Sequence, residues 1–285
     1  MTSREQQAEF LLEAMPYIEK YQNKILVIKY GGNAMINEEL KDLVMRDLTL
    51  LQFVGIKVVL VHGGGPDISK TMQRMGIESR FVGGLRYTDK ETAEVVRMVL
   101  AGKVNKELVH KLGILGAKSV GICGIDGQLL YCQKEREELG FVGKIEEVHT
   151  EIITDALANG YLPVISTVGY DEEGNIYNVN ADTAASAIAG ALQAESLILM
   201  TDIRGLLRNK DDEESLIKKV YVSDIPSLVN DGVISGGMIP KIHCCKEAIR
   251  KGVNRVFITD GRVKHSILLE LLSDEGMGTM FVKGD

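Results

Sequence analysis

Cysteine is scarce in this chain, with four residues in a sequence of 285. Cys123 and Cys132 do not have the spacing of metal ligands, and Cys244 and Cys245 are adjacent. So few cysteines in a chain of this length do not form the disulfide framework of a small secreted domain. We therefore predict reduced thiols and no metal site.

Long apolar runs are also missing, since none approaches the roughly 18–20 residues of a membrane-spanning helix. The N-terminal segment MTSREQQAEF lacks the apolar core of a signal peptide. The formal net charge is -7, so the chain has no excess of positive charge for general binding of nucleic acid or anionic membranes. These absences predict a cytoplasmic protein that binds neither, and in which a local cluster of cations holds any anionic ligand.

Short apolar runs alternate with longer helical patterns along the chain. The runs occupy residues 25–28, 57–62, 118–123, 162–166, 196–202 and 255–260. Patterns with apolar residues three and four positions apart occupy residues 38–55, 90–102, 181–193 and 238–252. This alternation is typical of a mainly parallel sheet covered by helices on both faces. The predicted fold class is therefore α/β, a three-layer sandwich, formed as one large domain or two lobes.

Two segments depart from this alternation. Residues 3–21 have an apolar stripe that predicts an amphipathic helix, and Pro16 should kink it. This helix packs either on its own core or on another subunit. Residues 172–182 contain a glycine and asparagines, which indicate a turn and then a helix start. We divide the chain there, into an N-terminal helix and two lobes; the three segments are 1–24, 25–175 and 176–285.

Two glycine-rich turns directly follow strands, YGGNAM at 30–35 and HGGGPD at 62–67. In an open parallel sheet, ligands bind beyond the carboxyl ends of the strands. A glycine turn that opens a helix presents backbone N–H groups and the positive end of the helix dipole to an anion. Alternatively, the glycines only allow tight turns. Lys29, directly before the first turn, favours an anion site.

Neither turn is a P-loop or a dinucleotide-binding fingerprint, because the chain has no GxxxxGK[ST] and no GxGxxG after a strand. The chain also contains KYGGNAM, VVLVHGGGPDI, GGLRYTD, NVNADTAA, LMTDIRGLL, ISGGMIPK and GMGTM, in this order and over nearly its whole length. With these seven motifs the sequence resembles the N-acetyl-L-glutamate kinases of the amino acid kinase family.

The resemblance implies an enzyme that transfers the γ-phosphoryl group of ATP to the side-chain carboxylate of N-acetyl-L-glutamate, the second step of arginine biosynthesis. It also implies the amino acid kinase fold, with the acyl-amino-acid site in the N-terminal lobe and the nucleotide in the C-terminal lobe. A carboxylate nucleophile is ionised at neutral pH and needs no general base, so catalysis requires positioning and charge stabilisation. Mg²⁺ is expected with ATP, held by phosphates and water.

Other interpretations stay open. One is a sister kinase acting on aspartate, glutamate, carbamate, a nucleoside monophosphate or a carrier-bound aminoadipate. The chain ends soon after GMGTM, so we expect no appended regulatory domain of the aspartate-kinase kind. Another is a catalytically silent sensor of amino acids or nucleotides, which would lack one of the catalytic residues.

The resemblance assigns roles to individual residues. Lys29 and Lys241 would stabilise the transition state, with Asp182 between them; alternatively, Asp182 only begins a helix. The implied substrate-binding residues are Gly64, Gly65, Arg86, Asn178 and Asn180, and the implied nucleotide-binding residues are Gly32, Asp202, Gly205, Ser235 and Gly236. Arg86 would pair with a substrate carboxylate. Alternatively, it is a surface residue and the asparagines form turns. His62 is assigned to structure or to packing of the substrate loop, because the reaction needs no base.

The N-terminal helix and residues 264–280 resemble those of arginine-inhibited members of the family. In those proteins the N-terminal helices interlace to form a hexamer, a trimer of dimers, and L-arginine binds beside that helix. The implied arginine contacts are Tyr17, Lys219, His265, Glu275 and Gly278. Alternatively, the segment is an ordinary helix and edge strand. The sequence does not indicate whether a PII-like signalling protein binds.

Overall fold

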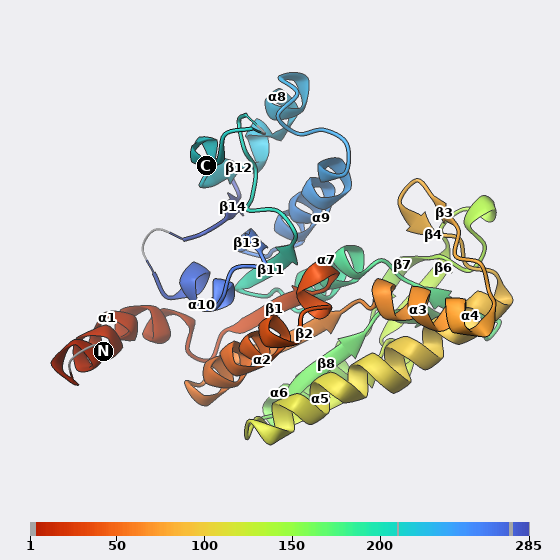
Figure 1. Cartoon of the computed structure of the whole chain (residues 1–285), viewed down its shortest axis with the longest axis horizontal. Helices are drawn as coiled ribbons and strands as arrows, with labels where there is room; N and C mark the ends of the chain where they lie inside the picture. Colours follow the sequence, from red (N-terminus) through yellow and green to blue (C-terminus); the bar gives the residue numbers. More distant parts are fainter. Residues whose placement is uncertain (1–3, 210, 274–275, 285) are drawn as a thin grey trace.

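The computed structural model describes residues 4–209, 211–273 and 276–284. Its central layer is an eight-stranded sheet (Figure 1). From one edge to the other, the strands are β12 (Lys219–Tyr221), β14 (Thr279–Val282), β13 (Arg255–Asp260), β11 (Ser196–Thr201), β1 (Ile25–Tyr30), β2 (Lys57–His62), β8 (Leu162–Ser166) and β5 (Ser119–Cys123). Only β13 and β14 pair antiparallel; the other neighbours are parallel. The predicted α/β class and mainly parallel sheet are confirmed.

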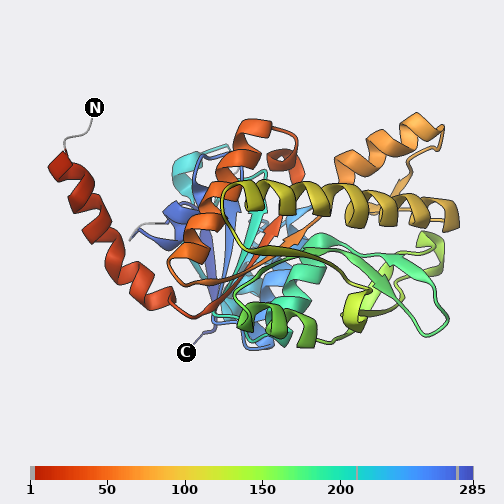
Figure 2. The same ribbon diagram turned by 90° about the horizontal axis from the view of Figure 1, so that it is seen from below.

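Helices cover both faces of this sheet, as Figure 2 shows. Side chains alternate along each strand, so Leu26 and Ile28 face one layer and Val27 faces the other. The first layer contains α2 (Glu38–Phe53), α3 (Gly65–Met75), α4 (Lys90–Arg97), a π-helical segment (Met98–Val104), α5 (Asn105–Ile114) and α10 (Ser266–Leu271). The second contains α6 (Glu151–Ala158), α7 (Ala181–Ala191), α8 (Ile225–Asn230) and α9 (Met238–Arg250).

Two smaller sheets lie outside the predicted strand pattern. One has the order β10 (Ile176–Asn178), β9 (Val168–Tyr170), β6 (Leu130–Lys134) and β7 (Gly143–Val148). The other is the hairpin of β3 (Phe81–Val82) and β4 (Leu85–Arg86). Such short strands give little periodicity to recognise. The predicted lobe boundary falls in the turn between β9 and β10, and the division into lobes stays a prediction.

The N-terminal helix α1 (Arg4–Tyr21) projects from the body of the molecule (Figures 1 and 2). Its last residue, Tyr21, is buried in the core, whereas Leu12 and Met15 are 64% and 58% exposed. Pro16 lies inside the helix without ending it, and a kink there stays a prediction. Among the described helices, none is long and apolar enough to cross a membrane.

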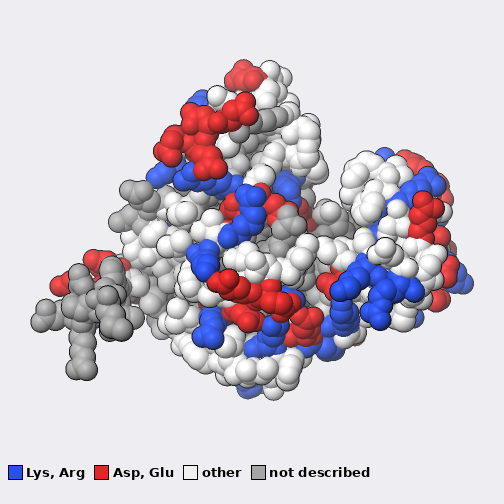
Figure 3. Space-filling view, in the orientation of Figure 1, with Lys and Arg blue, Asp and Glu red and all other residues white. Residues whose placement is uncertain are grey.

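Charged side chains on the face shown in Figure 3 form small adjoining groups of opposite sign. On α2, Glu38 and Asp42 both pair with Lys111 of α5, at 3.2 and 2.6 Å. Lys264, in the turn after β13, pairs with Glu39 of α2. Exposed pairs of this kind contribute little individually to stability, but here they join α2 to α5 and to the turn after β13.

Candidate active site

Lys29 is the cation at the end of β1, a central strand whose residues are buried from Leu26 onward. The side chain is only 8% exposed. Its Nζ lies 3.0 Å from Oδ1 of Asp182 and 3.5 Å from the carbonyl oxygen of Met200. The apolar strand thus carries an ammonium group to the carboxyl edge of the sheet, where a carboxylate compensates its charge.

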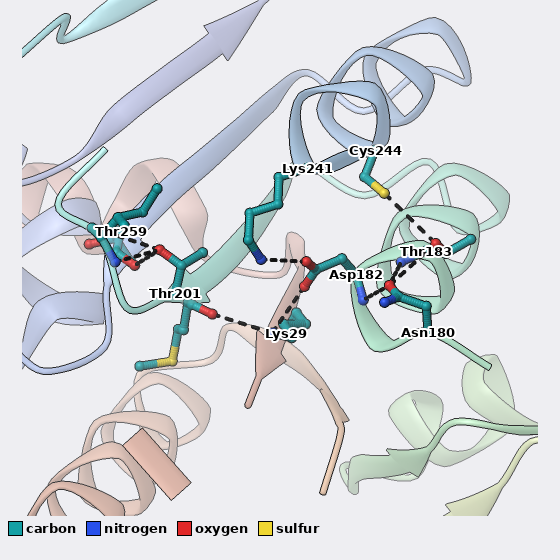
Figure 4. Close-up of polar contacts among 10 residues, drawn as sticks. Lys29, Asn180, Asp182, Thr183, Thr201, Lys241, Cys244 and Thr259 are labelled. Atoms are coloured by element: carbon teal, nitrogen blue, oxygen red, sulfur yellow. Dashed lines mark hydrogen bonds and ion pairs between the residues drawn. The ribbon is translucent and has the colours of Figure 1, made fainter. Parts of the chain in front are cut away.

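Asp182 lies in the first turn of α7, which Asn180 caps (Figure 4). The Asn180 side-chain oxygen accepts hydrogen bonds from the backbone N–H groups of Asp182 and Thr183, at 3.0 and 3.1 Å. Lys241, in the first turn of α9, donates to Oδ2 of Asp182 at 2.6 Å. Three distant segments therefore bring two ammonium groups onto one carboxylate and leave a net positive charge.

Asp182 is largely buried, and burial by itself would raise its pKa. The charges of Lys29 and Lys241 and their hydrogen bonds outweigh that effect and hold the pKa below its usual range. Asp182 therefore stays ionised at neutral pH, as it must to hold two cations.

Two cavities adjoin at Lys29 and Gly32, which line both. The larger, here called the large cavity, has a volume of about 880 Å³ and is bounded by β11, β13 and the start of α9. The small cavity, about 290 Å³, is bounded by the HGGG turn, the β3–β4 hairpin and the segment before α7. Lys241 lines the large cavity. Two ligands, one in each cavity, can therefore meet beside the two lysines.

The structure sorts the predicted binding residues between the cavities. All five residues implied for the substrate line the small cavity: Gly64, Gly65, Arg86, Asn178 and Asn180. Four of those implied for the nucleotide line the large cavity: Gly32, Asp202, Gly205 and Ser235. Gly236 lies in the same turn as Ser235 but does not line the cavity, whereas its neighbour Gly237 does. The ligands themselves stay predictions.

Arg86 is 7% exposed, so it is not the surface arginine of the alternative interpretation. Its guanidinium donates to Oγ of Ser79 (2.7 Å), Oγ of Ser69 (2.8 Å) and the carbonyl of Gly65 (3.0 Å), and it lies over the ring of Phe81. Among the described residues, no carboxylate pairs with it. Burial lowers the pKa of Arg86, and a carboxylate ligand would supply the missing counter-charge.

Asn178 and Asn180 differ in the hydrogen bonds that they form within the protein. Asn178 donates to Oγ1 of Thr88 at 3.2 Å. The oxygen of Asn180 is occupied in capping α7, which is the structural role considered as its alternative. A contact of either residue with substrate stays a prediction.

The HGGG turn is tightly packed. A Cβ on Gly64 would lie 2.6 Å from Cδ2 of Leu100 and 3.3 Å from Cγ2 of Val104, both in the π-helical segment. Gly65 begins α3, followed by Pro66. Within the described part of the chain, the amides of Gly64 and Gly65 have no hydrogen-bond partner. They are therefore available to an anion at the start of α3.

The large cavity includes residues that the motifs did not assign. Asp260 ends β13 and accepts hydrogen bonds from the guanidinium of Arg262 at 2.7–3.2 Å, and both residues line the cavity. The position of Asp260 at the carboxyl end of a strand was a usable signal. Close packing explains why residue 205 is a glycine, since a Cβ there would lie 2.6 Å from Oγ1 of Thr279.

Four of the residues predicted to bind arginine are described, Tyr17, Lys219, His265 and Gly278, and they do not line either cavity. The ammonium group of Lys219 lies over the ring of Tyr221, and Nδ1 of His265 is 2.6 Å from Oδ1 of the buried Asp47. The amide of Gly278 donates to the carboxylate of Glu270 at 2.8 Å. Tyr17 is in α1, and Glu275 lies outside the described residues. Arginine binding by this set stays a prediction.

His62 is completely buried at the end of β2. Its Nδ1 lies 2.8 Å from the carbonyl oxygen of Gly63, and its Nε2 lies 3.2 Å from Nδ2 of Asn105. Burial lowers the pKa of His62 to about 4. The ring is therefore neutral and in contact with the glycine turn, as predicted for a structural histidine.

Comparison with known proteins identifies the class. The model of the amino acid kinase family matches residues 24–260. The chain therefore belongs to the amino acid kinase family and is a kinase.

Full-length relatives narrow the class further. The acetylglutamate kinase of Brachyspira hyodysenteriae is 54% identical over 283 residues, which are 99% of this chain and 98% of that protein. The acetylglutamate kinase of Clostridioides difficile is 54% identical over 279 residues, 98% of each chain. A solved structure of N-acetylglutamate synthase from Neisseria gonorrhoeae, with coenzyme A and N-acetyl-glutamate, has a TM-score of 0.84 and 25% identity. That match covers 98% of this chain and 64% of the synthase chain.

Acid should destabilise the protein partly through His62. The unfolded chain binds a proton near the ordinary pKa of 6.5, whereas the folded chain does so only near 4. The contribution of the neutral His62 ring to the free energy of unfolding is present in full above pH 6.5 and is lost as the pH falls toward 4. At about pH 5, the loss should reach about 2 kcal/mol.

Urea unfolding of the native protein and of His62→Gln, at pH 7.5 and pH 5, measures this loss. Comparison of the two proteins cancels the contributions of other titrating groups. The variant should show a smaller loss of stability between these pH values. Equal losses in the two proteins would contradict the assignment.

Proposed function

We propose that this kinase transfers the γ-phosphoryl group of ATP to the side-chain carboxylate of N-acetyl-L-glutamate, giving N-acetyl-L-glutamyl 5-phosphate in arginine biosynthesis. The proposal is carried by one observation: two cavities adjoin beside two lysines that share one carboxylate. Cations in that place can stabilise the charge on a phosphoryl group during transfer. The name of the relatives, acetylglutamate kinase, supports the choice of substrate.

The small cavity suits a dianionic acyl amino acid. Its charged lining residues are Lys29 and Arg86, and no described residue that lines it is an acid or a histidine. Arg86 is proposed to pair with the α-carboxylate, while the side-chain carboxylate points to Lys29. The absence of a base among these lining residues agrees with a nucleophile that is already ionised.

The large cavity is proposed to bind ATP. Lys241 would face the phosphates from this side, and Asp202, Gly205 and Ser235 would contact the nucleotide. Mg²⁺ would be held mainly by phosphate oxygens and water, because no group of three metal-ligating side chains occurs among the described residues. When bound, the ion would neutralise phosphate charge.

In the proposed step, a carboxylate oxygen of the substrate forms a bond to the γ-phosphorus. The bond from that phosphorus to the β–γ bridging oxygen breaks, and ADP leaves with the electron pair. Lys29 would stabilise the transferring group from the small cavity and Lys241 from the large cavity. Asp182 would keep both ammonium groups in place without entering the reaction.

A hydroxamate assay tests this activity. Incubation with ATP, Mg²⁺ and N-acetyl-L-glutamate, followed by hydroxylamine, should trap the acyl phosphate as a hydroxamate. Aspartate, glutamate and carbamate should give much less product, because only the acylated amino acid is expected to fill the cavity. A yield no higher than that of a blank without substrate would refute the proposed function.

Loss of either lysine should lower kcat by about two to three orders of magnitude, since each supplies charge stabilisation to the transition state. Lys29→Met and Lys241→Met are the variants, with circular dichroism as the test of folding. Lys264→Met is the control, because Lys264 forms an ion pair with Glu39 outside both cavities. Turnover close to that of the control would remove the lysine concerned from the catalytic set.

We also propose that this cytoplasmic enzyme assembles as a hexamer, a trimer of dimers, and that L-arginine inhibits it. The support is the projecting helix α1 with its exposed Leu12 and Met15. A helix with an uncovered apolar side is suited to packing on another subunit. Tyr17 and His265 belong to the proposed arginine site.

Deletion of residues 1–15 should leave a dimer that arginine inhibits only weakly. The deletion stops short of Tyr21, which is buried in the core. Light scattering after size-exclusion chromatography, with and without arginine, gives the assembly. A hexamer that survives the deletion would exclude interlaced helices, and Glu9→Gln serves as the control on the same helix.

A further inference from the structure

The hydrogen bonds of His62 determine which ring nitrogen carries its proton. A carbonyl oxygen only accepts, so the contact with Gly63 requires the hydrogen on Nδ1. On the other side, the amide nitrogen of Asn105 donates to Nε2. The same nitrogen donates to the carbonyl of Val164 at 2.8 Å, while the Asn105 oxygen accepts from Lys106 at 3.1 Å. Asn105 therefore holds His62 in the neutral Nδ1–H tautomer.

This tautomer matters because of the peptide that it contacts. A peptide between two glycines, Gly63 and Gly64, has little steric resistance to rotation about its flanking bonds. The Gly63–Gly64 peptide is trans, so its C=O and N–H point in opposite directions. With the Gly63 carbonyl bound to the buried imidazole, the N–H of Gly64 points away from His62, and Gly64 itself lines the small cavity.

The glycine turn is also held from two other directions. Gly63 donates its N–H to the carbonyl of Tyr30 on β1 at 3.0 Å. Leu100 packs directly against Gly64. These contacts fix where the turn lies. Among the described residues, the bond from His62 is the one hydrogen bond made by the C=O or the N–H of the Gly63–Gly64 peptide.

We infer that His62 and Asn105 form a positioning pair that directs the Gly64 N–H at an oxygen of the bound anion. The inference rests on the proposed function, which places the transferring phosphoryl group and the acceptor carboxylate beside this turn. His62 does not line either cavity and acts only through the peptide. It is a positioning residue, not a base, since its donor is already used and its ring is shielded from the ligand.

Two substitutions of His62 separate positioning from packing. Asparagine places an amide nitrogen near the position of Nδ1, whereas glutamine places one near Nε2. His62→Gln should therefore lower kcat about 10- to 100-fold, as expected for a misdirected donor to the transition state, with KM for ATP changed less than about twofold. His62→Asn should recover most of the lost rate.

His149 offers a matched control. Its Nδ1 also lies 2.8 Å from a backbone carbonyl, that of Gln128, but the side chain is 38% exposed and lines neither cavity. His149→Gln should leave kcat unchanged. Equal loss in His62→Gln and His62→Asn, or a kcat for His62→Gln within twofold of the native protein, would overturn the inference.

Nitrogen-15 NMR of the histidine rings tests the same idea without activity. The native protein should show the neutral Nδ1–H form for His62 near pH 7.5. Asn105→Asp replaces the donor to Nε2 by an acceptor, so the ring should become Nε2–H or cationic, and kcat should fall. A native ring in the Nε2–H form refutes the positioning pair even if the hydroxamate assay succeeds. If that assay fails while the Nδ1–H form is found, the proposed function fails instead.

Discussion

The pairing of two lysines with one buried aspartate is the interaction on which the rest of this site depends. Without Asp182, Lys29 and Lys241 would repel each other, and the buried ammonium group of Lys29 would lose its counter-charge. With it, the three groups carry one excess positive charge next to two cavities. The fold secures this arrangement by packing α7 against β1 and by a hydrogen bond from Ser186 of α7 to the carbonyl of Cys244 in α9, at 2.8 Å.

The same principle extends to Arg86. Neutral partners, two serine hydroxyls and a carbonyl, orient the guanidinium without neutralising it. Positive charge is thus concentrated locally in a chain whose formal net charge is -7. A site built in this way gains most from a ligand that brings its own negative charges, because the ligand completes ion pairs that the protein leaves open.

The sequence predicted the parts of this site better than their assembly. An apolar run ending in Lys29, a helix start at Asp182 and a glycine turn before Lys241 are local patterns, and each was found where expected. The convergence of the three side chains depends on strand order and helix packing, which periodicity does not encode. The partners of Arg86 were missed for a similar reason, because Ser69 and Ser79 belong to no motif and reach the arginine only through the fold of the β3–β4 hairpin.

The glycines near the site illustrate why a motif alone underdetermines mechanism. Gly205 is packed against Thr279, Gly64 against Leu100, and Gly32 has a φ of +71° beside the carboxylate of Asp202. Close packing requires two of these glycines and a left-handed backbone requires the third, although the motifs show the same residue type at all three positions. The role of His62 is likewise not evident from its motif. A histidine beside a glycine turn could be taken for a general base. The ring is buried, its tautomer is fixed, and the nucleophile of the proposed reaction is already ionised, so the remaining role of His62 is to orient a peptide. The proposed catalysis therefore depends on how rigidly the lysines and the backbone donor are held in place, the lysines by the charged Asp182 and the donor by the neutral His62 and Asn105.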